Sequence, residues 1–96
     1  MIDIDFFRKD IIIALETLPD GEQLIIIWIK LLLLAKKHNN GGLICFLKNI
    51  DVTDELLACF LNTRVSFVTY ALKVFSFYGM IERKNGTLKI LNLGDW

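Results

Sequence analysis

Apolar residues recur at helical spacing near the start of the chain. Their pattern predicts a first helix over residues 6–18, which ends at Pro19 because proline cannot continue a helix. Asp20 is then expected to cap the helix that follows. Ile12 and Ile13 lie off the main apolar stripe, so we expect them to contact another subunit, the alternative being a single exposed isoleucine. The stripe itself consists of Phe7, Ile11, Ala14, Leu15 and Leu18.

A second helix is predicted over residues 22–38, and it is apolar around most of its circumference. Its polar positions Gln23, Lys30 and Lys37 are seven residues apart and form one narrow stripe. Nearly every other residue from 24 to 35 is leucine, isoleucine, tryptophan or alanine. A helix of this kind is buried, and in so small a domain its neighbours are expected to include another subunit.

Two shorter elements and a long helix follow. After two glycines, the apolar run at residues 43–47 predicts a strand. Thr53 is expected to cap a short helix over residues 54–61, and a tight link leads to a long helix over residues 64–78. Gly79 fits the position after this helix, where glycine adopts the left-handed conformation without strain.

The end of the chain predicts a β-hairpin. Residues 80–91 form two alternating runs around Asn85-Gly86, the strongest short-range signal for a tight hairpin turn. Helix, turn, helix and hairpin in this order predict a winged helix, mainly α with a small β-wing and an extra N-terminal helix; the strand at 43–47 would pair with the hairpin. In such folds the second helix commonly enters the DNA major groove.

The long helix is expected to have a core side and an opposite side. On the opposite side, Phe67, Tyr70 and Val74 would form an oligomer or partner interface, because aromatic residues are enriched at protein contacts. The alternative is that Val74 and Phe77 fold back under the wing or the second helix, leaving only Phe67 and Tyr70 exposed. The core side is expected to hold Val65, Val68, Ala71, Leu72 and Phe75.

Composition narrows the function classes. The 96 residues suffice for one domain, and 54% of them are hydrophobic, with a mean hydropathy of +0.49. So large an apolar fraction in a short chain favours a homo-oligomer. Eleven basic and eleven acidic residues cancel, which counts against tight DNA binding by an isolated copy but permits a local basic patch.

Catalysis, metal binding and membrane insertion are not expected. Cys45 and Cys59 lack the spacing of metal ligands and are expected to be reduced in a cytosolic core. His38, the sole histidine, is expected to be exposed at a helix end. The acidic residues have no partner base or nucleophile, and Gly41-Gly42 precedes a strand rather than the helix of a phosphate loop. No cofactor is implied, and the apolar run at 24–35 is too short to span a bilayer.

A set of short segments matches one family of replication proteins in order and spacing. The segments are Asp5-Phe6-Phe7, Leu18-Pro19-Asp20-Gly21, Ile29 to Ala35, Asn40-Gly41-Gly42, Thr53 to Leu56, Ala71 to Phe75 and Gly79 to Glu82. They resemble the N-terminal domain of phage replisome organisers, relatives of the DnaD-like primosome proteins of low-GC Gram-positive bacteria. The match is fairly specific, because generic winged helices lack the Leu-Pro-Asp-Gly joint followed by a Leu-rich helix.

The resemblance implies that residues 1–96 form a single winged-helix domain at the N-terminus of a replisome organiser, acting in the cytoplasm of a bacterial host. It implies a role in phage DNA replication initiation. The implied partners are phage origin DNA, further copies of the chain, and host helicase-loading or initiator proteins.

The DNA-binding candidates lie on the two elements that a winged helix presents to a duplex. Arginine and lysine reach phosphates, and arginine also reads guanine edges; the alternative is a solvated helix face and an ordinary charged hairpin. Aromatic residues on the long helix, where family members often have charged ones, count against base reading. A pure protein-interaction module and a winged-helix transcription regulator remain the rival functions. The candidates are Arg64, Ser66, Thr69, Lys73, Arg83, Lys84 and Lys89.

Overall fold

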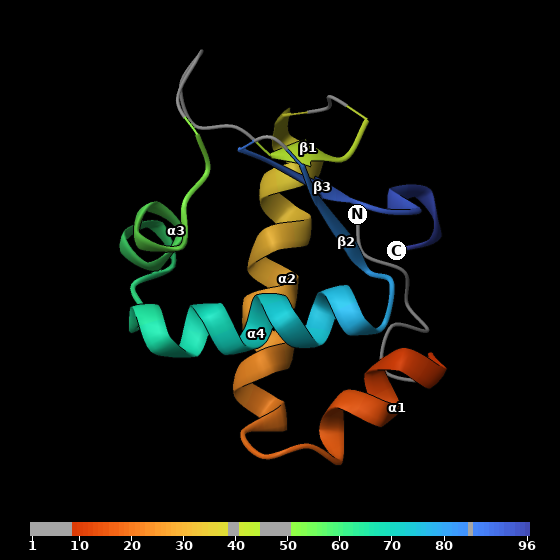
Figure 1. Ribbon diagram of the computed structural model, residues 1–96. Coiled ribbons are helices and arrows are strands. Elements are labelled where there is room, and N and C mark those ends of the chain that lie inside the picture. Colours follow the sequence, from red (N-terminus) through yellow and green to blue (C-terminus); the bar gives the residue numbers. More distant parts are fainter. Residues whose placement is uncertain (1–8, 39–40, 45–50, 85) are drawn as a thin grey trace.

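In the computed structural model, the described residues (9–38, 41–44, 51–84 and 86–96) form four α-helices and a three-stranded antiparallel sheet (Figure 1). The elements are α1 (Asp10–Glu16), α2 (Gly21–His38), β1 (Leu43–Ile44), α3 (Asp54–Leu61), α4 (Val65–Phe77), β2 (Ile81–Lys84), β3 (Thr87–Ile90) and the short 3₁₀ helix η2 (Leu93–Asp95).

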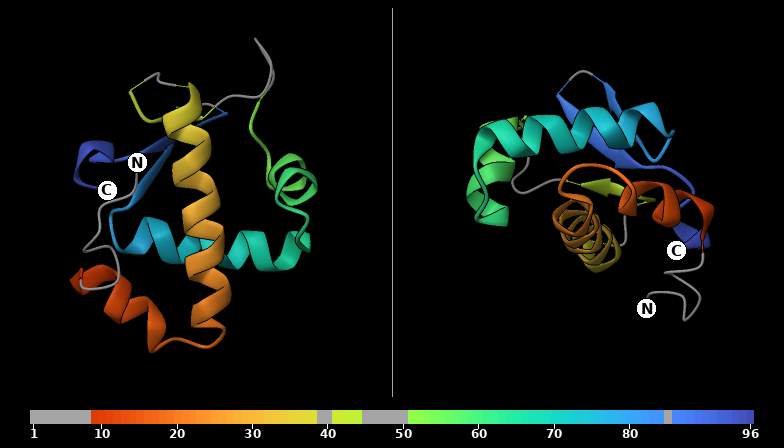
Figure 2. Two further views of the ribbon diagram at one scale, coloured as in Figure 1. Left: turned by 180° about the vertical axis from the view of Figure 1, so that it is seen from behind. Right: turned by 90° about the horizontal axis from the view of Figure 1, so that it is seen from below.

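The long helix α2 forms the centre of the core, and α4 crosses it (Figures 1 and 2). Trp28 of α2 is fully buried, with its ring centroid 5.1 Å from that of Phe75 in α4 and 5.1 Å from that of Trp96. The bounds of α2 confirm the predicted helix 22–38 to within one residue. Its exposed stripe is wider than predicted, because Ile26 and Leu33 are 46% and 53% exposed.

The hairpin is confirmed, and β1 joins it as the third strand. In the strand order β1-β3-β2, Ile81 pairs with Ile90 and Lys84 pairs with Thr87, which leaves a two-residue turn. Gly86 in this turn has a φ of 79°. This is the positive φ that the glycine of an Asn-Gly hairpin turn adopts. The rest of the predicted strand 43–47 lies outside the described residues.

Helix ends follow the predicted signals. The Thr53 hydroxyl accepts a hydrogen bond of 3.1 Å from the Leu56 N–H at the start of α3. After α4, the N–H of Gly79 donates to Ser76 and the N–H of Met80 donates to Phe75. With Gly79 at a φ of 71°, these two bonds form a Schellman motif, which satisfies carbonyls at the end of the helix.

The order α2, β1, α3, α4, β2, β3, with β1 paired to β3, is that of a winged helix, and α1 is the extra N-terminal helix. The predicted fold class is therefore confirmed. The first helix is shorter than the predicted span of 6–18: it begins at Asp10, after Lys9 in extended geometry, and ends at Glu16. Residues 6–8 lie outside the description.

The rotation of α1 corrects one prediction. Ile12 is fully buried in the core together with Leu15, three positions along the same helix. It faces the interior of its own chain and is not an interface residue. Ile13 is 50% exposed, so only Ile13 is available to a second subunit.

Two further side chains, Val65 and Cys59, lie elsewhere than predicted, and the exposure of Phe77 decides between the two alternatives for that residue. Val65 is 41% exposed because it is the first residue of α4 and shares the exposed arc of the helix rather than the core arc. Cys59 is exposed on α3 rather than buried, and Cys45 lies outside the described residues. Phe77 is 83% exposed, so it does not fold back under the wing. His38 is exposed, as predicted.

The joint between α1 and α2 explains why Asp20-Gly21 occurs there. Asp20 has a φ of 57°, and its carbonyl accepts the hydrogen bond from the Leu24 N–H at 3.0 Å. Asp20 therefore accepts the first hydrogen bond of α2 with its backbone carbonyl, and its backbone lacks the extended conformation of a residue that caps a helix with its side chain. The prediction that Asp20 caps this helix is corrected accordingly. Gly21 is pressed against the end of α1, where a Cβ would collide with the Leu15 carbonyl. A side chain at Gly21 would therefore force the two helices apart.

Candidate nucleic-acid interface

The exposed arc of α4 is more polar than the sequence indicated. Ser66, Lys73 and Ser76 are exposed along it, and Thr69 is half-buried between them. Arg64, at the N-cap position of the helix, is also exposed. Seen from below, α4 and the hairpin lie on the same side of α2 (Figure 2, right). This arc could reach a DNA groove without an aromatic ring at its centre.

Two aromatic residues of α4, Phe67 and Tyr70, lie on its flank near the α1–α2 joint, whereas Phe77 is 83% exposed near the end of the helix. Phe67 and Tyr70 are half-buried with ring centroids 5.7 Å apart, and the Tyr70 hydroxyl donates to the Pro19 carbonyl at 3.4 Å. A shallow cavity of about 580 Å³ separates this flank from Gln23 and Asn62. The alternative prediction that left only Phe67 and Tyr70 exposed is therefore wrong, because both are half-buried and Phe77 is exposed.

The wing divides its basic residues between two faces. Successive strand residues point to opposite faces, and Arg83 is opposite the buried Leu88, so it is on the inner face. Lys84 and Lys89 are exposed on the outer face, where Lys89 is opposite Glu82. Arg83 is exposed as well, but of the three predicted wing residues only Lys84 and Lys89 are on the outer face.

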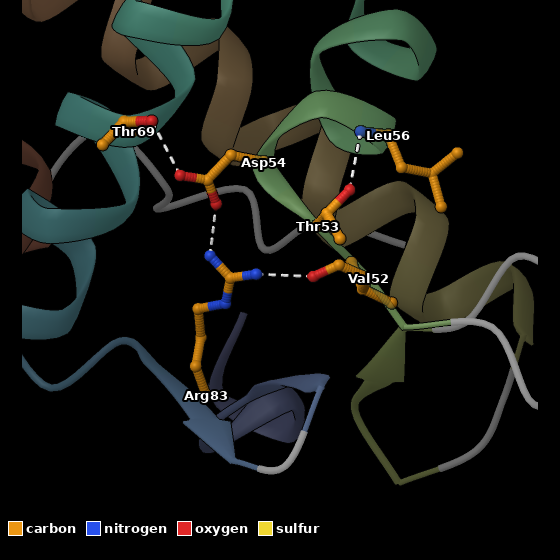
Figure 3. Close-up of polar contacts among 6 residues, drawn as sticks. All are labelled: Val52, Thr53, Asp54, Leu56, Thr69 and Arg83. Atoms are coloured by element: carbon orange, nitrogen blue, oxygen red, sulfur yellow. Dashed lines mark hydrogen bonds and ion pairs between the residues drawn. The ribbon is translucent and has the colours of Figure 1, made fainter.

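Arg83 instead ties the wing to both helices of the helix-turn-helix (Figure 3). Its guanidinium forms an ion pair with Asp54 in the first turn of α3 and donates to the Val52 carbonyl. The other carboxylate oxygen of Asp54 accepts a hydrogen bond of 2.7 Å from the Thr69 hydroxyl of α4. Thr69 and Arg83, both predicted to contact DNA, are therefore occupied by Asp54.

The network also shifts the ionisation of Asp54. The hydrogen bond from Thr69, and then the hydrogen bond and positive charge of Arg83, lower the pKa of Asp54 below its ordinary value, against the opposing effect of partial burial. Lys73 contributes further in the same direction. Asp54 is therefore a carboxylate at neutral pH and holds α3, α4 and β2 together.

Replacing this carboxylate should weaken the domain in a pH-dependent way. We expect Asp54→Ala to lower the free energy of unfolding by about 1–2 kcal/mol near neutral pH, as expected for one partly exposed ion pair and its hydrogen bonds. Because the folded-state pKa is below the unfolded one, the stabilisation is complete above about pH 4–5 and is lost as the pH falls through the folded pKa. Urea unfolding across this pH range measures the difference.

Glu55→Ala is the matched control for this experiment. Glu55 is an exposed acidic residue in the same first turn of α3, so its removal changes the interaction with the helix dipole by a similar amount. An equal loss of stability in the two variants would show that the network contributes nothing beyond that dipole term.

Asp54 is the residue that sequence reasoning missed. The sequence pattern singled out only its neighbour Thr53, as the cap of this helix. The available signal was strand alternation, which places Arg83 on the same face as the buried Ile81. An arginine on an inner face needs an acceptor, and Asp54 is the acidic residue that the fold brings there.

The interface candidates on α4 border a groove. Tyr70 and Val74 are half-buried, and together with Leu18, Lys73, Phe77 and Tyr78 they line an apolar hollow of about 310 Å³. Phe67 lies outside this hollow and borders the larger cavity instead. Phe67, Tyr70 and Val74 are therefore neighbours along one flank of α4, whereas Ile13 is on a different helix, α1.

Within the described residues, no group of three or more histidine, cysteine, aspartate or glutamate side chains could hold a metal ion. No helix in this part of the chain has the length and apolar character needed to cross a membrane.

Comparison with known proteins gives one family. The family model described as the N-terminal phage replisome organiser matches residues 1–96, the whole of the sequence. Searches of curated proteins and of solved structures give no match.

Proposed function

Because the chain belongs to the N-terminal phage replisome organiser family, whose members act in phage DNA replication, we propose that it is a DNA-associated, self-assembling domain. In this proposal it helps a replisome organiser bind the phage origin and recruit the helicase-loading or initiator proteins of the bacterial host, in the host cytoplasm.

The observation that carries the DNA-binding part is the polar exposed arc of α4. Of the aromatic residues that counted against base reading, Phe67 and Tyr70 lie on the flank of the helix, where the Tyr70 hydroxyl donates to the Pro19 carbonyl. Phe77 remains exposed, at the end of α4. Ser66 and Lys73 are left exposed on the arc. An exposed helix of a winged helix commonly inserts into the major groove, and side chains of this size and polarity contact base edges and phosphates.

The wing supplies the second contact. Lys84 and Lys89 on its outer face are suited to phosphate oxygens, and Arg64 at the start of α4 is suited to a guanine edge. Arg83 has a positioning role, because its ion pair with Asp54 fixes the wing relative to α4. Glu82 beside Lys89 reduces the local positive charge, which limits the affinity of a single copy.

Salt dependence tests this assignment. We expect Lys73→Ala, Lys84→Ala and Lys89→Ala each to weaken binding to all duplexes about equally and to reduce the slope of log affinity against log salt by about 0.9. Arg64→Ala should instead reduce the preference for origin DNA over other sequences. Mobility shift against origin and unrelated duplexes across a salt series measures both effects.

Lys36→Ala is the matched control, because it removes one lysine from α2 and leaves α4 and the wing unchanged. Unchanged affinity and salt slope in a Lys84→Ala/Lys89→Ala double variant would overturn the DNA-binding part. The domain would then be better described as a protein-interaction module, a function favoured by the exposure of Leu33, Phe60 and Phe77.

A further inference from the structure

A second groove lies between α2 and α3, away from the proposed DNA contacts. It has a volume of about 310 Å³ and is lined by Leu33 and Leu34 of α2 and by Phe60 and Leu61 of α3. Leu33 and Phe60 are each 53% exposed. We call this hollow the α2–α3 groove.

The charge beside the α2–α3 groove has one sign. Lys30 and Lys37 are part of its lining, which contains no acidic side chain. Lys30 also donates to the Leu61 carbonyl at 3.3 Å, which uses one of the three donors of its ammonium group. The groove therefore suits an apolar side chain flanked by carboxylates.

The outer face of α1 has the complementary chemistry. Asp10, Ile13 and Glu16 are three positions apart and all exposed, with Ile13 50% exposed. Residues at this spacing lie on one side of a helix. The face therefore presents one apolar side chain between two carboxylates, and we call it the α1 face.

The two surfaces cannot meet within one chain. In all three views, α1 and α3 lie on opposite sides of the molecule, with α2 between them (Figures 1 and 2). A contact between the α1 face and the α2–α3 groove therefore requires two copies of the chain.

We propose that Ile13 of one copy inserts into the α2–α3 groove of a second copy, between Leu33 and Phe60. Asp10 and Glu16 then lie near Lys30 and Lys37 of that second copy. The contact is head-to-tail, because each copy uses a different surface, so repetition produces a ring or an open filament rather than a symmetric dimer. The proposal rests on the self-assembly part of the proposed function and names its interface.

Two substitutions each remove one of these surfaces without disturbing the monomer. Leu33→Glu places a carboxylate within one helical turn of Lys30 and Lys37, which stabilises α2 locally, but it repels the incoming α1 face. Ile13→Lys is stabilised by Asp10 and Glu16 in the same way, but it repels the lysines of the groove. We expect wild type to associate at high micromolar concentration in sedimentation equilibrium, and each variant to be monomeric.

Mixing the two variants gives the decisive measurement. The Ile13→Lys variant keeps an intact groove, and the Leu33→Glu variant keeps an intact α1 face, so one productive contact remains between them. We expect an equimolar mixture to form a one-to-one dimer that grows no further. A mixture that stays monomeric would overturn the pairing of these two surfaces.

Phe77→Glu is the control, because Phe77 is a more exposed apolar residue outside both surfaces. We expect it to leave the assembly unchanged; dissociation by Phe77→Glu, or persistence of the assembly in Ile13→Lys and Leu33→Glu, would overturn this interface alone. A monomeric wild type would overturn both this interface and the self-assembly part of the proposed function. Both substitutions leave the proposed DNA-contacting residues of α4 and the wing unchanged, so a mobility shift with each monomeric variant tests DNA binding separately from assembly.

Discussion

Gly42→Ala is expected to lower the free energy of unfolding by about 2–5 kcal/mol. Gly42 is buried with a φ of 89°, and a left-handed conformation costs an alanine about 1–2 kcal/mol. In addition, a Cβ at Gly42 would overlap the carbonyl oxygen of Ile90, and overpacking of this kind costs about 1–3 kcal/mol. The Ile90 N–H donates to the Gly42 carbonyl at 2.8 Å, so neither backbone can move away without losing a sheet hydrogen bond.

Gly41→Ala separates the two causes. Gly41 has a φ of 63°, but a Cβ there meets no atom within 4 Å. Gly41→Ala should therefore lower the free energy of unfolding only by the cost of the left-handed conformation, about 1–2 kcal/mol. Urea unfolding of both variants compares them directly. Equal losses would mean that the contact between Gly42 and Ile90 is looser than the structure indicates.

Trp28→Ala is expected to cost about 3–5 kcal/mol, the usual range for removing a large aromatic residue from a core. Trp28 is fully buried and its ring lies against both Phe75 of α4 and Trp96 near the end of the chain. The substitution would therefore remove contacts that join α2, α4 and the end of the chain. Urea or thermal unfolding gives the value.

Trp28→Phe should be much milder than Trp28→Ala. The indole Nε1 is buried without a hydrogen-bond partner among the described residues, so replacing the indole by a benzene ring loses no hydrogen bond and removes an unsatisfied donor. Only the volume difference leaves a cavity. A loss as large as that of the alanine variant would show that the N–H is satisfied by an internal water.

Local signals predicted much of the fold. The Thr53 cap, the Gly79 helix end and the Asn85-Gly86 turn each depend on a few neighbouring residues, so the sequence contains the whole cause. The apolar helix 22–38 was equally clear, because eighteen residues of α2 give the helical period many repeats.

Rotation about a short helix was harder to predict. The seven described residues of α1 span about two turns, and three consecutive isoleucines leave the buried side undefined. Packing against α2 selects Ile12 over Ile13, and that choice depends on the joint at Asp20-Gly21. The network of Asp54, Thr69 and Arg83 is similarly non-local, since it joins residues from α3, α4 and β2.

The edge-to-face contact between Trp28 and Trp96 has a consequence for spectroscopy. These are the two tryptophans of the sequence, and both are buried in one cluster. Neither belongs to the polar arc of α4 or lines the α2–α3 groove. Their emission should be blue-shifted in the native domain and should report unfolding with little response to DNA or to assembly. Tyr70 and Tyr78 line the apolar hollow beside Val74 and Phe77 on α4. They are the intrinsic fluorophores placed to respond when a ligand covers that side.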